Sequence, residues 1–213
     1  MTRGMFITLE GVEGVGKSTN MDFMVDRLAE AGFDVMPTRE PGGTPMAERI
    51  REMLLKRGDE RLPDLAELLL FFAARTMHIE NAIRPALAAG RWVICDRFTD
   101  ASRAYQGAGR GLNMERINTL ARWTHGNLNP DLTVLLDAPA AVGMGRAEKR
   151  GTADRLESEQ LSFYTRVRKQ YLELAAREPE RFAVIDASQA LVAVQAQINN
   201  AVEQLISRQM ERK

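Results

Sequence analysis

The sequence predicts an α/β fold in which a parallel sheet of five strands lies between two layers of helices. Short apolar segments rich in β-branched residues recur along the chain, and longer segments with apolar residues at helical spacing separate them. This alternation predicts right-handed βαβ units and a mostly parallel sheet. The predicted strands show no polar alternation, which is typical of a sheet covered on both faces.

Five segments are expected as strands. They are Met5–Leu9, Phe33–Thr38, Trp92–Cys95, Leu132–Leu136 and Phe182–Ile185. Further helices are expected at Lys17–Ala31, Met46–Lys56 and from near Ser188 onward. Asp64 followed by Glu67 resembles a capping box, and it predicts a long apolar helix from there to Gly90, kinked at Pro85.

The composition fits one α/β domain that spans residues 1–213. A chain of 213 residues can bury a core without disulfides. Lys plus Arg and Asp plus Glu both number 29, and this balance argues against a general nucleic-acid binder, which needs a large positive surplus.

The lengths of the apolar segments indicate where the protein is located in the cell. The first apolar run is short and flows into a glycine loop, unlike a secretory signal. The longest, Leu68–Ala74, is too short to span a bilayer. Cys95 lies in an apolar stretch and is expected in the core. We therefore expect a soluble cytoplasmic protein without a membrane segment.

A glycine-rich segment links the first predicted strand to the first predicted helix. It reads Gly11-Val12-Glu13-Gly14-Val15-Gly16-Lys17-Ser18, with Thr19 next, and fits the pattern G-x-x-x-x-G-K-[ST]. Glycines let the backbone N–H groups point at phosphate oxygens, and the helix N-terminus adds partial positive charge. Lys17 would bridge the β- and γ-phosphates of ATP, and Ser18 would ligate Mg²⁺. The segment predicts an ATP site and a three-layer P-loop NTPase fold, and a chance glycine-rich turn is the alternative.

Two aspartates end predicted strands. Asp96 follows the third strand and Asp137 the fourth, so either could lie near Mg²⁺ at the carboxyl edge of the sheet. Asp96 is favoured because Arg97 follows it, and this pair could reach metal and phosphate together. Asp137 is more readily explained as a strand-end cap before Pro139.

The sequence lacks the motifs of other classes of phosphate-loop protein. A GTPase needs Asn-Lys-x-Asp and an Asp-x-x-Gly switch, and an ABC-type ATPase needs a Ser-Gly-Gly-Gln-like signature. None of these strings occurs in the chain. The remaining natural class is the nucleoside monophosphate kinases and their relatives.

Four segments resemble the thymidylate kinase family, from Glu10 to about Glu157, with a weaker match to the end of the chain. They are Glu10–Ser18, Arg39-Glu40-Pro41-Gly42-Gly43-Thr44, Phe71-Phe72-Ala73-Ala74-Arg75, and Asp96-Arg97-Phe98 with Ser102 and Ala104-Tyr105-Gln106. In this order and at these distances they are highly specific, and they look like the bacterial form of the family. The resemblance implies transfer of the γ-phosphoryl group of ATP to dTMP, giving dTDP and ADP for dTTP biosynthesis. It also implies Mg²⁺ bound with ATP and a homodimer.

The resemblance assigns base and sugar contacts to side chains in these segments. Phe71 and Arg75 lie four residues apart on one helical face, where an aromatic ring can stack on thymine and a guanidinium can donate to its carbonyl. Core packing is the other explanation for Phe71. Ser102 and Gln106 could read the base edge. Tyr105 could wall off the sugar 2′ position, or be an ordinary half-buried tyrosine.

Charged residues in the same segments are expected to hold the phosphates and the sugar. In the family, the position of Glu13 hydrogen-bonds the sugar 3′-OH and helps to set the metal. Arg97 would hold the acceptor phosphate. Arg39 faces that phosphate or forms a structural salt bridge, and Arg51 is a base-side contact or a solvated arginine. Pro41 is expected to line the acceptor pocket, where its peptide bond could be cis.

The charged segment at about 143–157 resembles the mobile lid that closes over ATP. Arg146 and Arg150 share a helical face there. The phosphate loop has no basic residue before Lys17, so the extra positive charge at the transferring phosphate is expected from Arg150 and Arg146. Arg155 is a third, weaker candidate.

Asp186-Ala187-Ser188 resembles the loop that passes the adenine. His78 and His125 have no ligand-like spacing, so no metal site is expected besides the Mg²⁺ that ATP brings. Two rival functions stay open: a kinase for another monophosphate or a deoxynucleoside, and a non-catalytic ATP-binding switch or regulatory subunit.

Overall fold

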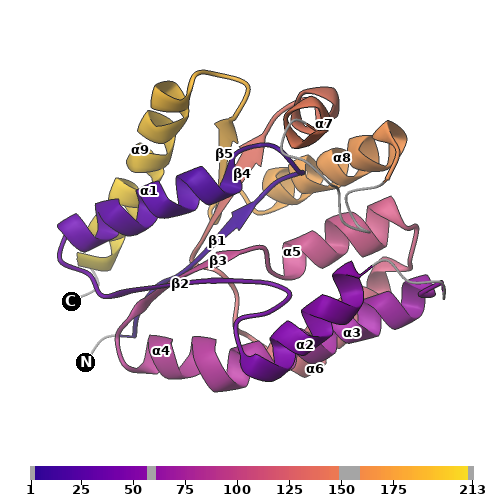
Figure 1. Cartoon of the computed structure of the whole chain (residues 1–213). Coiled ribbons are helices and arrows are strands. Elements are labelled where there is room, and N and C mark those ends of the chain that lie inside the picture. The colour runs from indigo at the N-terminus through magenta and orange to yellow at the C-terminus, as the bar shows by residue number, and fades with distance from the viewer. Residues whose placement is uncertain (1–2, 57–60, 149–158, 211–213) are drawn as a thin grey trace.

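Five parallel strands form one sheet in the order β2-β3-β1-β4-β5 (Figure 1). The computed structural model describes residues 3–56, 61–148 and 159–210. The strands are β1 (Phe6–Glu10), β2 (Val35–Arg39), β3 (Trp92–Asp96), β4 (Leu132–Asp137) and β5 (Phe182–Asp186). All five expected strands are confirmed, although β2 begins and ends slightly later than the predicted Phe33–Thr38.

Helices cover both faces of this sheet. They are α1 (Lys17–Glu30), α2 (Pro45–Leu55), α3 (Asp64–His78), η1 (Ile79–Ile83), α4 (Arg84–Ala88), α5 (Thr99–Ser102), η2 (Arg103–Gly109), α6 (Met114–His125), α7 (Ala140–Glu148), α8 (Leu161–Arg177) and α9 (Leu191–Met210). Helices α1 and α9 pack together against one face, and α4 and α8 contact the other. Among the described helices, none has the length and apolar character that a membrane span requires.

The long helical stretch expected from Asp64 runs to Ala88 in three parts. Between α3 and α4, the five residues of η1 form a π-helix that ends just before Pro85. Proline lacks a backbone N–H, and the wider turn ahead of it changes the hydrogen-bonding pattern where that donor is missing. A second π-helix, η2, spans seven residues on the way from β3 to α6.

The expected capping box at the start of α3 is wrong. Pro63 precedes the helix, and no side chain caps its first turn. Glu67 is instead buried, and it accepts hydrogen bonds from Gln106 and Arg110 of a neighbouring segment. The acidic residue three positions after Asp64 therefore serves a tertiary contact, which a local pattern does not reveal.

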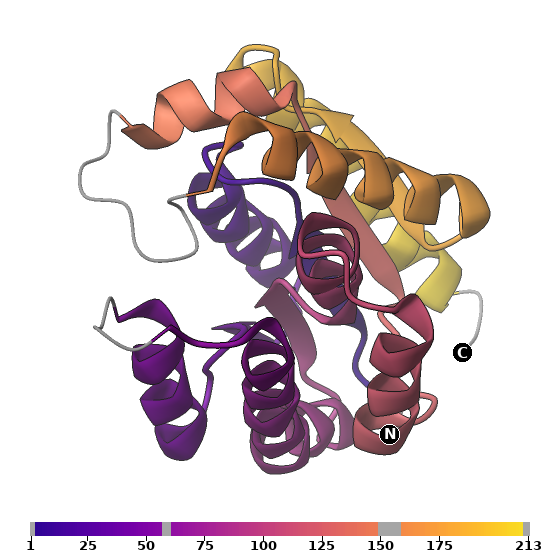
Figure 2. The ribbon, with the colours of Figure 1, turned by 90° about the vertical axis from the view of Figure 1, so that its right-hand side faces the viewer.

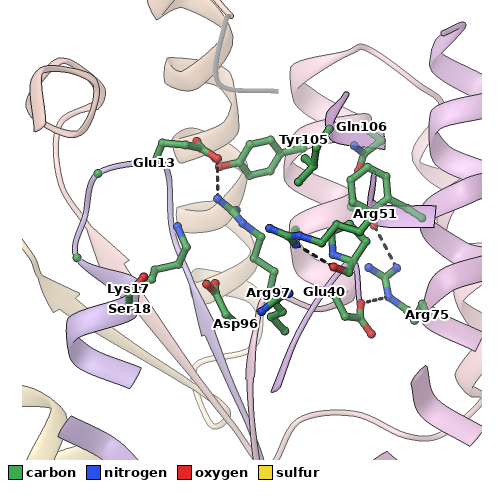
Figure 3. A pocket seen from close by; sticks show the side chains of 18 of the residues that line it. Glu13, Lys17, Ser18, Glu40, Arg51, Arg75, Asp96, Arg97, Tyr105 and Gln106 are labelled. Atoms are coloured by element: carbon green, nitrogen blue, oxygen red, sulfur yellow. Dashed lines mark hydrogen bonds and ion pairs between the residues drawn. The ribbon is translucent and has the colours of Figure 1, made fainter. Parts of the chain in front are cut away.

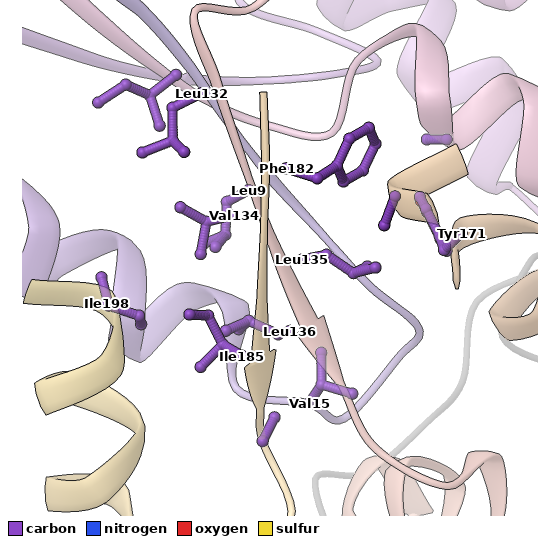
Figure 4. Packing of buried hydrophobic residues seen from close by; sticks show 14 of the residues in the cluster. Leu9, Val15, Leu132, Val134, Leu135, Leu136, Tyr171, Phe182, Ile185 and Ile198 are labelled. Carbon is purple, nitrogen blue, oxygen red and sulfur yellow. The ribbon is translucent and has the colours of Figure 1, made fainter. Parts of the chain in front are cut away.

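The core lies on both sides of the central strands (Figure 4). Val134 and Leu136 of β4 point toward α9, where Ile198 is fully buried. Leu135 points the opposite way, on the side of Tyr171 in α8. This packing explains why β4 is apolar at successive positions, since both faces of the sheet are covered.

The packing of α9 gives a direct test of this core. Replacing Ile198 by alanine removes buried methyl groups and leaves a cavity, so the free energy of unfolding should fall by about 2–5 kcal/mol. Val192, in the same helix, is 79% exposed, and Val192→Ala should change the free energy of unfolding by less than about 0.5 kcal/mol. Urea unfolding of both variants measures the difference. Equal effects would contradict the assigned face of α9.

Candidate active site

A cavity of about 460 Å³ lies at the carboxyl edge of the sheet, next to the ends of β1 and β3 (Figure 3). Figure 2 shows α2 and α3 on one side of the phosphate loop and α7 and α8 on the other. The cavity is lined by many of the residues that the sequence predicted for the site: Glu13, Gly14, Gly16, Lys17, Ser18, Thr19, Arg39, Pro41, Arg51, Phe71, Arg75, Asp96, Arg97, Ser102, Tyr105, Gln106 and Arg146.

The phosphate loop is a tight turn whose glycines take conformations that other residues rarely adopt. Gly11 has a φ of 139°, and a Cβ there would lie 2.5 Å from the Leu136 carbonyl oxygen. Val12 and Val15 are buried in the core instead of facing the cavity. Their packing anchors the loop, and Gly14 and the residues from Gly16 to Thr19 line the cavity.

Lys17 folds back onto this loop. Its Nζ donates to the carbonyl oxygens of Gly11 at 3.3 Å and of Val12 at 3.0 Å. Burial and the nearby Arg97 lower the pKa of Lys17, while Asp96 and Glu13 oppose this change. The ammonium group is thus held at the cavity wall by neutral acceptors, which a phosphate oxygen can replace with a charged one.

Arg97, Glu13 and Tyr105 form one connected group across the cavity (Figure 3). Arg97 Nη2 donates to Glu13 Oε1 at 2.7 Å, and the Tyr105 hydroxyl donates to Glu13 Oε2 at 2.7 Å. The guanidinium of Arg97 also lies 4.6 Å from the centre of the Tyr105 ring. Arg97 has a φ of 71°, a backbone conformation that is uncommon outside glycine and frequent at functional sites.

A buried acidic side chain supports this group from behind. Glu10, the last residue of β1, accepts from the Tyr171 hydroxyl and from the Phe98 backbone N–H, each at 2.7 Å. Burial raises the pKa of Glu10 to about 8; the charge of Asp100 adds to this rise, and the Tyr171 hydrogen bond opposes it. Tyr171 also lies 3.4 Å from Arg97 Nη1, so Glu10 and α8 together brace Arg97.

The two strand-end aspartates have different surroundings. Both carboxylate oxygens of Asp137 accept from Arg168, at 2.7 and 2.9 Å. Asp96 lines the cavity, and its buried Oδ1 has no hydrogen-bond partner among the described residues. The exposed Ser18 lines the same cavity, so a carboxylate oxygen without a partner and a hydroxyl oxygen are both available there, and Mg²⁺ prefers such oxygen ligands.

A second group of potential metal ligands lies behind the cavity. Side-chain atoms of Glu40, His78 and Cys95 lie within 4.8 Å of one another. Glu40 is already paired with Arg75 at 2.6 Å and with His78 Nδ1 at 3.1 Å. Burial raises the pKa of the Cys95 thiol well above its usual range, which disfavours the thiolate that a metal requires. We therefore interpret this group as a buried hydrogen-bond cluster.

Arg75 is anchored at the opposite end of the cavity from the phosphate loop. Its three nitrogens each donate once, to Glu40 Oε2 at 2.6 Å, to Ser102 Oγ at 3.1 Å and to the Phe98 carbonyl oxygen at 3.1 Å. Because a guanidinium carries five N–H groups, these three hydrogen bonds leave two N–H groups without a hydrogen-bond partner among the described residues. Phe71, one helical turn earlier, both lines the cavity and packs in the cluster between α2 and α3.

The turn after β2 forms another wall. The peptide bond between Glu40 and Pro41 is cis, and the Pro41 carbonyl oxygen accepts from Arg51 Nη1 at 2.8 Å. Arg39 lies 3.0 Å from Glu48 in a largely exposed ion pair. Arg39 thus has the structural salt bridge that the sequence allowed, although its side chain also reaches the cavity.

The expected lid is described only up to the end of α7. Arg146 lines the cavity, and its Nη1 donates to the Ala187 carbonyl oxygen at 2.9 Å. This contact joins α7 to the loop after β5, which resembles in sequence the loop that passes the adenine. Arg150 and Arg155 lie outside the described residues.

The comparisons with known proteins agree on one family. A family model described as thymidylate kinase matches residues 9–198. A thymidylate kinase of Pseudomonas putida (strain GB-1) is 54% identical over 205 residues, which is 96% of this chain and 98% of that protein. The chain belongs to the thymidylate kinase family.

Further relatives extend this finding to the fold. A thymidylate kinase of Ectopseudomonas mendocina (strain ymp) is 54% identical over 95% of this chain and 97% of its own length. The crystal structure of thymidylate kinase from Ehrlichia chaffeensis is 32% identical, with a TM-score of 0.76, and covers 94% of this chain and 99% of that one. The P-loop NTPase fold expected from the sequence is thereby confirmed.

Sequence reasoning assigned no site role to several buried acidic residues of this family member. Glu40 and Glu67 hold Arg75 and Gln106, and Glu10 braces Arg97 through Tyr171. One signal was available for Glu67. It lies four residues before Phe71 and eight before Arg75, so all three share a helical face.

Glu10 predicts a specific pH dependence of stability. Its pKa is about 8 in the folded protein and 4.5 ordinarily, so between these values the folded protein holds a proton that the unfolded chain has lost. The stability from this proton is fully present below pH 4.5 and is lost as the pH rises through about 8. Glu10→Gln cannot ionise, and it should remove this decline from the curve of unfolding free energy against pH.

Urea unfolding at several pH values between about 5 and 9 measures the effect. Glu52→Gln removes an exposed carboxylate of α2 and serves as the control, which should keep the slope of the unmodified protein. A Glu10→Gln curve parallel to that of the unmodified protein would show that Glu10 is ionised in the folded state.

Proposed function

We propose that this chain transfers the γ-phosphoryl group of ATP to dTMP, giving dTDP and ADP. The observation that carries the proposal is one cavity with two chemically different ends. The phosphate loop with Lys17 forms one end, and Phe71 and Arg75 form the other. Arg97 lies between them, where two phosphate groups would meet. The names of the relatives support thymidylate as the acceptor.

The chemistry requires positioning and charge neutralisation more than covalent help from the protein. The acceptor phosphate is already ionised, so the chain needs no general base. We expect Lys17 to exchange the carbonyl oxygens of its loop for ATP phosphate oxygens. Arg97 is expected to turn from Glu13 to the acceptor phosphate. Bound Mg²⁺, held by Ser18 and Asp96, would supply further positive charge at the ATP phosphates.

The base is recognised by stacking and by hydrogen-bond polarity. Phe71 lines the cavity with an aromatic side chain that can stack on the base, and the N–H groups of Arg75 can only donate. Thymine presents a carbonyl at C4, whereas cytosine presents an amino group. Ser102 and Gln106 complete this end of the cavity.

The sugar is proposed to contact Glu13 and Tyr105. These side chains are hydrogen-bonded to each other at the cavity wall, so the carboxylate that we propose as the acceptor of the 3′-OH lies beside an aromatic ring. Arg39, Pro41 and Arg51 are proposed to close the acceptor side. A homodimer, a cytoplasmic location and a single domain over residues 1–213 are part of the same proposal. The homodimer rests on the family resemblance, the location on the short apolar segments, and the single domain on the length and composition of the chain.

A coupled assay of ADP release tests the function. The protein with ATP, Mg²⁺ and dTMP should release ADP only when the acceptor is present. ADP release with another monophosphate or a deoxynucleoside, but not with dTMP, would favour the rival kinase. ATP binding without acceptor-dependent ADP release would favour a regulatory protein.

Lys17→Ala should lower kcat by at least about a hundredfold, because it removes the charge that would bridge the β- and γ-phosphates. The thermal unfolding midpoint should change little. Lys169→Ala removes an exposed lysine of α8 and is the control. Near-normal turnover of a well-folded Lys17→Ala variant would refute the assignment of the phosphate loop.

The lid arginines are proposed to act in the transition state. Arg150→Ala should lower kcat strongly and leave the affinity for dTMP almost unchanged, and Arg146→Ala should do so to a smaller extent. Glu148→Ala is the control and should have little effect. If both arginine variants and their combination kept kcat within a factor of about three, the proposal would fail, since phosphate-neutralising arginines contribute far more.

A further inference from the structure

Glu67 is a buried carboxylate directly behind the base end of the cavity. Its side chain is 1% exposed. Glu67 Oε1 accepts from Gln106 Nε2 at 2.9 Å and from Arg110 Nε at 3.3 Å, and Oε2 accepts from Arg110 Nη2 at 3.3 Å. Gln106 is itself buried and lines the cavity. Glu67 therefore contacts the proposed base reader without lining the cavity itself.

The contact fixes which end of the Gln106 amide faces which way. A side-chain amide can turn over, and each orientation exchanges a hydrogen-bond donor for an acceptor. An ionised carboxylate can only accept. Turning the amide over would set its carbonyl oxygen against the oxygens of Glu67 and leave a buried acceptor unpaired. Glu67 thus selects the orientation in which Gln106 Nε2 faces Glu67 and Gln106 Oε1 faces away from it.

Arg110 is the charged partner of Glu67. The guanidinium contacts Glu67 and also pairs with Glu159, the first residue described after the expected lid. Its positive charge lies against the carboxylate in a place that is largely shielded from water. Arg110 donates to both carboxylate oxygens and so holds the Glu67 side chain in the position from which it accepts from Gln106.

We propose that Glu67 determines base specificity by holding the Gln106 carbonyl oxygen toward the nucleobase, where it accepts the N3–H of thymine. This inference rests on the proposed function and deepens it. Cytosine has an unprotonated N3 that can only accept, so it would meet the Gln106 oxygen with no hydrogen between them. Glu67 is a positioning residue that acts through Gln106.

The test uses three acceptors that separate the features of the base. 5-Methyl-dCMP keeps the methyl group of dTMP and differs at C4 and N3, whereas dUMP keeps the N3–H and lacks only the methyl group. In Glu67→Gln, the new amide can donate as well as accept and no longer selects one orientation. The ratio of kcat/KM for dTMP to that for 5-methyl-dCMP should fall about tenfold or more. The ratio of kcat/KM for dTMP to that for dUMP should stay within about twofold of its value in the unmodified protein, because both bases carry the same N3–H.

Two controls separate positioning from general damage. Asp64→Asn removes another carboxylate near Arg110, at 3.8 Å, whose side chain is 38% exposed; it should leave both ratios unchanged. In a Gln106→Leu background, Glu67→Gln should produce no further change in the dTMP to 5-methyl-dCMP ratio. A change that persists without Gln106, or that affects dUMP equally, would overturn the inference in favour of a structural role.

Binding measurements keep the inference testable apart from the proposed function. Calorimetry gives the Kd of dTMP and of 5-methyl-dCMP for the unmodified protein and for Glu67→Gln, without ATP. The preference for dTMP should shrink in the variant by about the same factor as the kinetic ratio. An equal preference in both proteins would overturn the inference. Absence of dTMP phosphorylation by the unmodified protein would instead overturn the proposed function, and the binding ratio would still decide the role of Glu67.

Discussion

The cavity depends on one constraint, which is that a charge removed from water needs an opposite charge beside it. Three glutamate–arginine pairs meet this constraint around one space: Glu13 with Arg97 at 2.7 Å, Glu40 with Arg75 at 2.6 Å, and Glu67 with Arg110 at 3.3 Å. Each pair joins segments that are far apart in the chain. Glu40 and Glu67 therefore hold their arginines in place before any ligand arrives, which lowers the entropy cost of ordering them on binding. Arg97 is instead expected to exchange Glu13 for the acceptor phosphate.

Much of the fold could be predicted because its signals are local. Apolar runs identified all five strands, and the phosphate-loop pattern located the start of α1. The capping box at Asp64 and Glu67 failed because a three-residue spacing is equally compatible with a buried side chain that finds a distant partner. The two π-helices also escaped prediction, since one additional residue in a turn leaves the apolar periodicity nearly unchanged.

The site was predictable where residues contact a ligand and less so where they contact one another. Motifs brought Lys17, Arg75 and Gln106 to one cavity, as the structure shows. The partners of these side chains lie 35 or more residues away for Arg75 with Glu40 and for Gln106 with Glu67. Sequence spacing cannot predict contacts between residues so far apart, because these contacts depend on how the helices pack. The different surroundings of Asp96 and Asp137 likewise follow from the position of α8.

The π-helix η2 has a consequence for how this part of the chain could have changed over time. Tyr105 and Gln106 are neighbours in sequence, yet both line the cavity from this widened turn. Deleting one residue between 103 and 109 could restore ordinary α-helical hydrogen bonds. It would also rotate the side chains on one side of the deletion by about 100° relative to those on the other. The length of this segment is therefore constrained separately from its composition. The sequences of relatives should differ here by substitutions far more often than by insertions or deletions.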